Sequence, residues 1–147
     1  MFKRILFLFS LGGILILPSL ASAHSLSAFA GTPSSPSEAA CWVHSNGAVT
    51  NTCSTTKRWC VALSVNNPGS FTVYVNAYGP SSSGNVGCFA RSVNGDATHN
   101  SSSPQVYLST FGSAQSLILP GAYVPSYGAL FACCDIGPAG RMNTVVW

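Results

Sequence analysis

The side chains of this sequence that could do chemistry are mostly aromatic and amide groups. Tyr74, Asn76 and Tyr78 alternate along one segment, so in a β-strand they would lie on one face. Tyrosine rings can stack on sugar rings while an asparagine amide supplies hydrogen bonds. The spacing favours a flat binding platform for a surface glycan or a protein. The alternative is that these tyrosines only cover an exposed sheet.

A copper site is a second possibility. Cleavage after Ala23 would make His24 the N-terminus of the mature chain, and its free amine and imidazole could chelate Cu(II) together. Asp96 and His99 lie three residues apart in one predicted loop and could complete a tetragonal N/O site. Copper is the cofactor of this alternative, whereas the platform interpretation requires none.

A small hydrolase is the third possibility. Catalysis by two carboxylates needs acids about 5 to 9.5 Å apart, and the predicted domain offers Asp96 and Asp135. The sequence lacks the G-x-S-x-G pattern of a serine nucleophile, and His44 and His99 are the in-domain bases. We therefore expect a non-catalytic protein.

The cysteines indicate structural crosslinks. Three disulfides at about 2 to 4 kcal/mol each would be comparable with the whole net stability of a small domain, about 5 to 15 kcal/mol. The six residues are Cys41, Cys53, Cys60, Cys88, Cys133 and Cys134.

Two of these cysteines are adjacent, which restricts the pairing. On a strand, Cys133 and Cys134 would point to opposite faces, so they need different partners. Cys134 shares its parity with the more apolar residues and is expected on the inner face. We favour a bond between Cys88 and Cys134, with Cys60 to Cys88 as a rival, and the sequence alone does not choose.

Period-2 alternation of apolar residues predicts the strands that would position these groups. The clearest pattern is a hairpin of residues 58–66 and 71–78, because Pro68 and Gly69 suit a tight reversal between them. Trp59 falls on the inward parity and is expected in the core, whereas Trp42 and Trp147 stay unassigned. Further strands are predicted over residues 87–93, 105–109, 115–119, 127–136 and 143–147.

These segments predict an all-β fold, since no convincing helical stripe accompanies them. About seven or eight short strands separated by Gly, Pro, Ser and Asn turns favour a small antiparallel β-sandwich stabilised by disulfides. A small β-barrel is the alternative.

The N-terminus has the layout of a secretory signal. Lys3 and Arg4 precede an apolar run over residues 5–16 and a small-residue stretch that ends at Ala23. The run is shorter than the roughly 20 residues of a spanning helix. We expect a signal peptide over residues 1–23, a flexible Ser/Pro/Ala-rich lead-in over 24–40 and one β domain over 41–147. The product would be secreted or periplasmic, without a membrane span.

The charge balance argues against nucleic acid as a partner. Only 6% of the 147 residues are charged, against roughly 25% in ordinary soluble domains. The formal net charge is +3, and Lys3 and Arg4 supply two of the positive charges. Binding to phosphates needs a patch of several cations, which the remaining chain does not offer.

The order of cysteines and turns resembles that of a group of small exported bacterial proteins. The match runs from Cys41 through Asn51 and Cys60, over the Val-rich strand and polar loop of residues 73–83, to 85–88 and Cys134 before Pro138. The resemblance implies a signal peptide followed by one Cys-bridged β domain. It supplies no catalytic residues, and residues 141–147 differ from the polar ending of that group.

Overall fold

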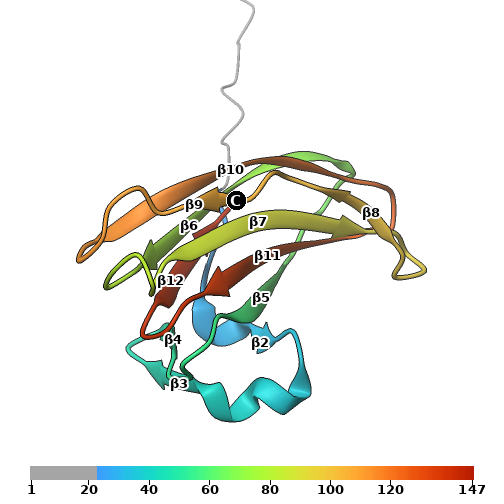
Figure 1. Cartoon of the computed structure of the whole chain (residues 1–147). Coiled ribbons are helices and arrows are strands. Elements are labelled where there is room, and N and C mark those ends of the chain that lie inside the picture. The colour runs from blue at the N-terminus through green and yellow to red at the C-terminus, as the bar shows by residue number, and fades with distance from the viewer. Residues whose placement is uncertain (1–22) are drawn as a thin grey trace, which may run out of the picture.

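The structure is a computed structural model that describes residues 23–147, and the predicted signal peptide lies outside these residues except for Ala23. Two antiparallel sheets pack face to face (Figure 1), which confirms the predicted β-sandwich rather than the barrel. Within the described residues, no helix has the length and apolar character to cross a membrane.

Each sheet has six strands, so residues 23–147 hold twelve, more than the seven or eight predicted. Sheet A has the order β10-β6-β12-β4-β3, with β1 also paired to β12, and sheet B has the order β2-β5-β11-β7-β8, with β9 also paired to β7. The strands of sheet A are β1 Ser25–Ser27, β3 Trp42–Ser45, β4 Ala48–Asn51, β6 Gly69–Tyr78, β10 Ala114–Val124 and β12 Arg141–Val146. The strands of sheet B are β2 Thr32–Pro33, β5 Lys57–Leu63, β7 Val86–Val93, β8 His99–Ser102, β9 Val106–Tyr107 and β11 Ala129–Ile136.

The core lies between the two sheets and is filled by the inward parity of each long strand. Val73, Val75 and Ala77 of β6 are fully buried, as their alternation predicts. Trp59 of β5 is 2% exposed, which confirms its assignment to the core.

The predicted hairpin is wrong, although both of its strands exist. β5 pairs with β2 and β11 in sheet B, whereas β6 pairs with β10 and β12 in sheet A. The turn at residues 64–68 therefore carries the chain from one sheet to the other. Alternation and a Pro-Gly turn fit such a corner as well as a hairpin, because both reverse the chain while keeping the apolar parity inward.

Residues 24–40 differ from the predicted flexible lead-in. β1 pairs with β12, β2 pairs with β5, and two 3₁₀ helices, η1 Ala28–Ala30 and η2 Pro36–Cys41, lie between these strands and β3. Ala28 is fully buried, and its carbonyl accepts a 2.9 Å hydrogen bond from Trp59 Nε1. Elements this short are fixed by backbone pairing and leave no period in the sequence.

All six cysteines are bonded. The bonds are Cys41–Cys53, Cys60–Cys133 and Cys88–Cys134, so the favoured pair is confirmed and the rival Cys60–Cys88 is wrong. Cys133 lies directly opposite Cys60 on β5, and Cys134 lies opposite Cys88 on β7. Cys134 belongs to the buried core, as expected, and the adjacent cysteines bond β11 to both of its neighbours through opposite faces.

Candidate functional site

The structure places Tyr74, Asn76 and Tyr78 on the outward face of sheet A. They lie on β6, which sits between β10 and β12 (Figure 1). Tyr74 is 42% exposed, while Asn76 and Tyr78 are half-buried. The side chains therefore share one face, but the three are unequally accessible.

The neighbouring strand β10 extends this face with exposed apolar groups. Ile118 lies opposite Tyr74 and is 58% exposed, and Tyr123 lies opposite Ser70 and is 52% exposed. Tyr78 and Tyr74 are four residues apart on β6, which at about 3.3 Å per residue is roughly 13 Å. Ser70, which lies opposite Tyr123, is four residues further along β6, so Tyr123 follows at a similar distance. We call Tyr78, Tyr74, Ile118 and Tyr123 the platform.

Tyr78 is covered by a cation on one side of its ring. Arg141 of β12 lies opposite Tyr78 and holds its guanidinium carbon 4.4 Å from the ring centroid. This contact has the geometry of a cation–π interaction. One ring face of Tyr78 is thus occupied, which leaves Tyr74 and Tyr123 as the more accessible tyrosines.

A second amide, which the sequence analysis missed, joins Asn76. Asn143 Nδ2 donates a 2.6 Å hydrogen bond to Asn76 Oδ1. The register of β12 against β6 shifts between Met142 and Thr144, and this bulge brings Asn143 beside Asn76. The bulge shifts the inward parity between Met142 and Val145, both fully buried, but the strand predicted here began only at residue 143, so this pair was not predicted. Asn76 Nδ2 and Asn143 Oδ1 make no hydrogen bond within the described residues.

A polar groove of about 490 Å³ begins beside this amide pair. It lies between the β1/β12 edge and the β3–β4 turn, where Asn46 and Gly47 both have positive φ, as in a type I′ hairpin turn. Its lining residues are Ser27, Ser45, Asn46, Gly47, Ala48, Thr50, Arg141, Asn143 and Thr144. Hydroxyl and amide groups with one cation make this groove suited to a neutral polar ligand.

The free edge of β10 is fixed by side chains from sheet B. Ser92 Oγ and Asn100 Nδ2 donate to Tyr123 O at 2.6 and 2.8 Å, and Tyr123 N donates to Ser101 Oγ at 3.0 Å. These bonds satisfy backbone groups that an edge strand would otherwise expose. The backbone that carries Tyr123 is therefore held from both sides.

The copper hypothesis is not supported by the arrangement of its residues. His24 lies beside β12, where its ring stacks on Trp147 at 5.6 Å, whereas Asp96 and His99 belong to the β7–β8 hairpin of sheet B. Hydrogen bonds from Thr98 lower the pKa of Asp96, and His99 Nε2 lies 3.0 Å from Ser102 Oγ. Over residues 23–147, no three His, Cys, Asp or Glu side chains gather into a metal site.

The acids and bases considered for hydrolysis are engaged elsewhere. Asp135 accepts hydrogen bonds from Arg58 Nε and Nη2 at 2.7 and 2.8 Å and from Gln105 Nε2 at 2.9 Å. Burial alone would raise the pKa of Asp135, but the hydrogen bonds from Arg58 and Gln105 and the charge of Arg58 outweigh it and lower the pKa. His44 packs edge-on against Phe29 and Trp59 at 5.0 and 5.4 Å. In the part of the chain that the structure describes, neither His44 nor His99 forms an ion pair with a carboxylate.

Comparison of the sequence with protein-family models and with curated proteins finds no match. Among solved structures, a GH26-CBM35 β-(1,4)-mannanase from Podospora anserina is similar to this chain with a TM-score of 0.50 and 9% identity. The match covers 84% of this chain and 27% of that one, so this chain spans about a quarter of the mannanase.

Two further structures match at lower TM-scores. TmCBM61 in complex with β-1,4-galactotriose has a TM-score of 0.43 and 11% identity, over 86% of this chain and 88% of that one. A structure of carbohydrate-binding modules from the β-sandwich superfamily has a TM-score of 0.45 and 11% identity, over 85% and 54%. At these identities, the comparisons concern the fold alone.

Proposed function

We propose that this chain is a secreted, non-catalytic carbohydrate-binding module that holds an extended, neutral glycan against the outer face of sheet A. The observation that carries the proposal is the row of Tyr78, Tyr74 and Tyr123 beside the Asn76–Asn143 pair. Aromatic faces stack on the apolar faces of sugar rings, and the amides bond their hydroxyl groups.

The spacing and charge of this face narrow the ligand class. Tyrosines separated by roughly 13 Å along one strand suit a long, straight chain better than a single sugar, because one ring cannot contact two of them. Arg141, whose guanidinium already packs on Tyr78, is the one charged residue lining the groove in the described chain. A neutral polysaccharide fits this surface better than an anionic one.

The three disulfides support the secreted location that the proposal includes. Disulfides persist in oxidising compartments, and this small domain has three. The predicted signal peptide and the resemblance to exported bacterial Cys-bridged domains support the same location. The sandwich fold is shared with the structure described as a GH26-CBM35 mannanase, and a surface glycan is accordingly the first partner to test.

Affinity electrophoresis of the mature chain in gels containing β-1,4-linked mannan, galactan or cellulosic polymers tests the proposal. We expect retardation by at least one neutral polymer. Tyr74→Ala and Tyr123→Ala should each weaken binding about fivefold, since an aromatic stack contributes on the order of 1 kcal/mol.

Tyr107→Ala is the matched control, because Tyr107 is 54% exposed but belongs to sheet B. Its binding should equal that of the unmodified chain. Absence of retardation in every polymer, or equal losses for Tyr74→Ala and Tyr107→Ala, would overturn the proposal.

A further inference from the structure

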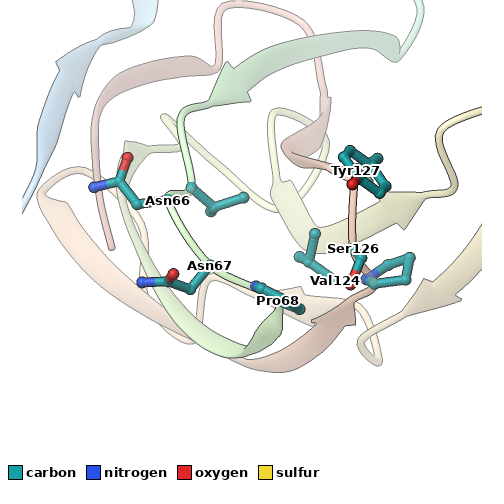
Figure 2. Close-up of a pocket in the computed structure, with 9 residues that line it drawn as sticks. Asn66, Asn67, Pro68, Val124, Ser126 and Tyr127 are labelled. Atoms are coloured by element: carbon teal, nitrogen blue, oxygen red, sulfur yellow. The ribbon is translucent and has the colours of Figure 1, made fainter.

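Two hollows meet at the end of the sandwich where the chain crosses between sheets. The first, about 370 Å³, lies between the turn at residues 65–68 and the turn at 124–128 (Figure 2). Figure 2 shows Asn66 and Asn67 on one side and Ser126 and Tyr127 on the other. The second, about 270 Å³, shares residues 65–67 and is bounded by His24 and Trp147.

Tyr127 is the most exposed large hydrophobic side chain of the described residues, at 97%. It occupies the third position of a turn closed by a 3.0 Å hydrogen bond from Gly128 N to Pro125 O, and its φ is +60°. Turns of this kind favour Gly or Asn at that position. A tyrosine with positive φ raises the free energy of the folded backbone, and its side chain buries almost no surface that would offset this. The stability of the fold therefore gives no reason for a tyrosine at this position.

The opposite wall is aromatic and held in place. The Trp147 ring stacks on His24 at 5.6 Å with 21° between the ring planes, and Trp147 Nε1 donates a 2.8 Å hydrogen bond to Ser64 O. The two aromatic walls thus flank the segment that carries Asn66 and Asn67. Neither asparagine side chain makes a hydrogen bond within residues 23–147, and both are exposed.

We propose that this end of the sandwich is a second saccharide site, separate from the platform, that takes a terminal sugar unit. The volume of the first hollow is at the small end of the range for ligand pockets, which suits one or two rings. The described lining residues of both hollows include no lysine, arginine, aspartate or glutamate side chain, so a neutral polyol suits the site better than a charged ligand. The inference extends the proposed function, because a chain-end site and a chain-internal platform together permit two-point binding.

The test titrates the ¹⁵N-labelled mature chain with methyl β-D-galactoside, methyl β-D-mannoside and methyl β-D-glucoside. We expect at least one of these probes to shift the amide signals of Asn66 and Asn67 and the indole signal of Trp147. Tyr127→Ala and Asn67→Ala should each weaken this binding by about tenfold. Tyr74→Ala should leave it unchanged. If no probe shifts these signals, or if Tyr127→Ala binds as the unmodified chain does, the site is refuted.

Two further variants separate a binding role from a structural one. Tyr127→Phe keeps the ring and should retain most of the affinity. Tyr127→Gly relieves the positive φ, so it should leave the melting temperature unchanged or higher while the glycosides no longer bind. A fall in melting temperature with unchanged glycoside binding would contradict the inference.

Failure of the second site is distinguishable from failure of the platform. Tyr127→Ala should retain the full polysaccharide retardation, which Tyr74→Ala weakens. If the glycosides shift no signals while Tyr74→Ala still weakens the retardation and Tyr127→Ala does not, the second site alone is refuted. Glycoside shifts without retardation in any polymer would refute the platform alone.

Discussion

At the scale of single residues, Asn51 connects more of the backbone than any side chain on the platform does. It is fully buried at the end of β4, and its Nδ2 donates to Ile136 O at 2.7 Å and to Thr55 O at 2.9 Å. Its Oδ1 accepts a 3.0 Å hydrogen bond from Cys53 N. One amide therefore joins β4, the end of β11 and the loop of the Cys41–Cys53 bond.

Replacing this amide should cost far more stability than replacing an exposed one. Asn51→Leu would leave two carbonyl groups and one N–H without their partner. The bond to Ile136 O is buried and the other two are part-buried, and an unsatisfied buried group costs about 1 to 3 kcal/mol. We expect the free energy of unfolding to fall by about 3 kcal/mol or more in urea denaturation. The exposed Asn67, replaced by Ala, is the control and should change it by less than about 0.5 kcal/mol. Equal effects of the two variants would show that the Asn51 bonds contribute little.

At the scale of elements, β11 is the central strand of sheet B. It pairs along its length with β5 and β7, and each neighbour is also bonded to it by a disulfide. The two bonds differ in access. Cys88 and Cys134 are both fully buried, whereas Cys60 is half-buried on the outer face of the sheet.

This difference predicts the order in which the native protein is reduced. Thiol–disulfide exchange requires that a thiolate reach one of the two sulfur atoms, so a buried disulfide is reduced only after the protein unfolds around it. We expect mild dithiothreitol, followed by alkylation and mass spectrometry, to label Cys60 and Cys133 before Cys88 and Cys134. In urea-denatured protein, the two pairs of cysteines should be labelled at the same rate. Labelling of Cys88 first in the folded protein would contradict this account of the sheet.

The sequence predicted which face each long strand buries, but not which strand lies beside it. Alternation assigned Val73 inward and Tyr74 outward correctly, because a side-chain period of two is a local property. The same alternation wrongly predicted that β5 pairs with β6. The partner of a strand depends on contacts between residues distant in the sequence, which a local pattern does not contain. The bulge at Asn143 was not predicted because the strand predicted there began only at residue 143, and the candidate site therefore lacked its second amide.

At the scale of the whole molecule, the distribution of charge matters more than its total. Two of the four cations of the β domain are paired, Lys57 with Glu38 at 3.2 Å and Arg58 with Asp135 at 2.7 Å. Arg141 packs on Tyr78, and Arg91 lies over Phe89 at 5.6 Å on the outer side of sheet B. Over residues 23–147, the four cations do not form an unpaired cluster that could follow a phosphate backbone.

Glycan binding by such a surface should be nearly independent of salt. Stacking and neutral hydrogen bonds are not screened, whereas six to ten phosphate contacts lose roughly 10³ to 10⁵ in affinity between about 50 and 200 mM salt. We expect the affinity for the retarding polysaccharide to change less than about twofold over this range in isothermal titration calorimetry. Arg91→Gln should bind with the same affinity at both salt concentrations, because Arg91 lies on the other sheet. A steep loss with salt would instead identify an anionic ligand, and a loss abolished by Arg91→Gln would move the binding surface to sheet B.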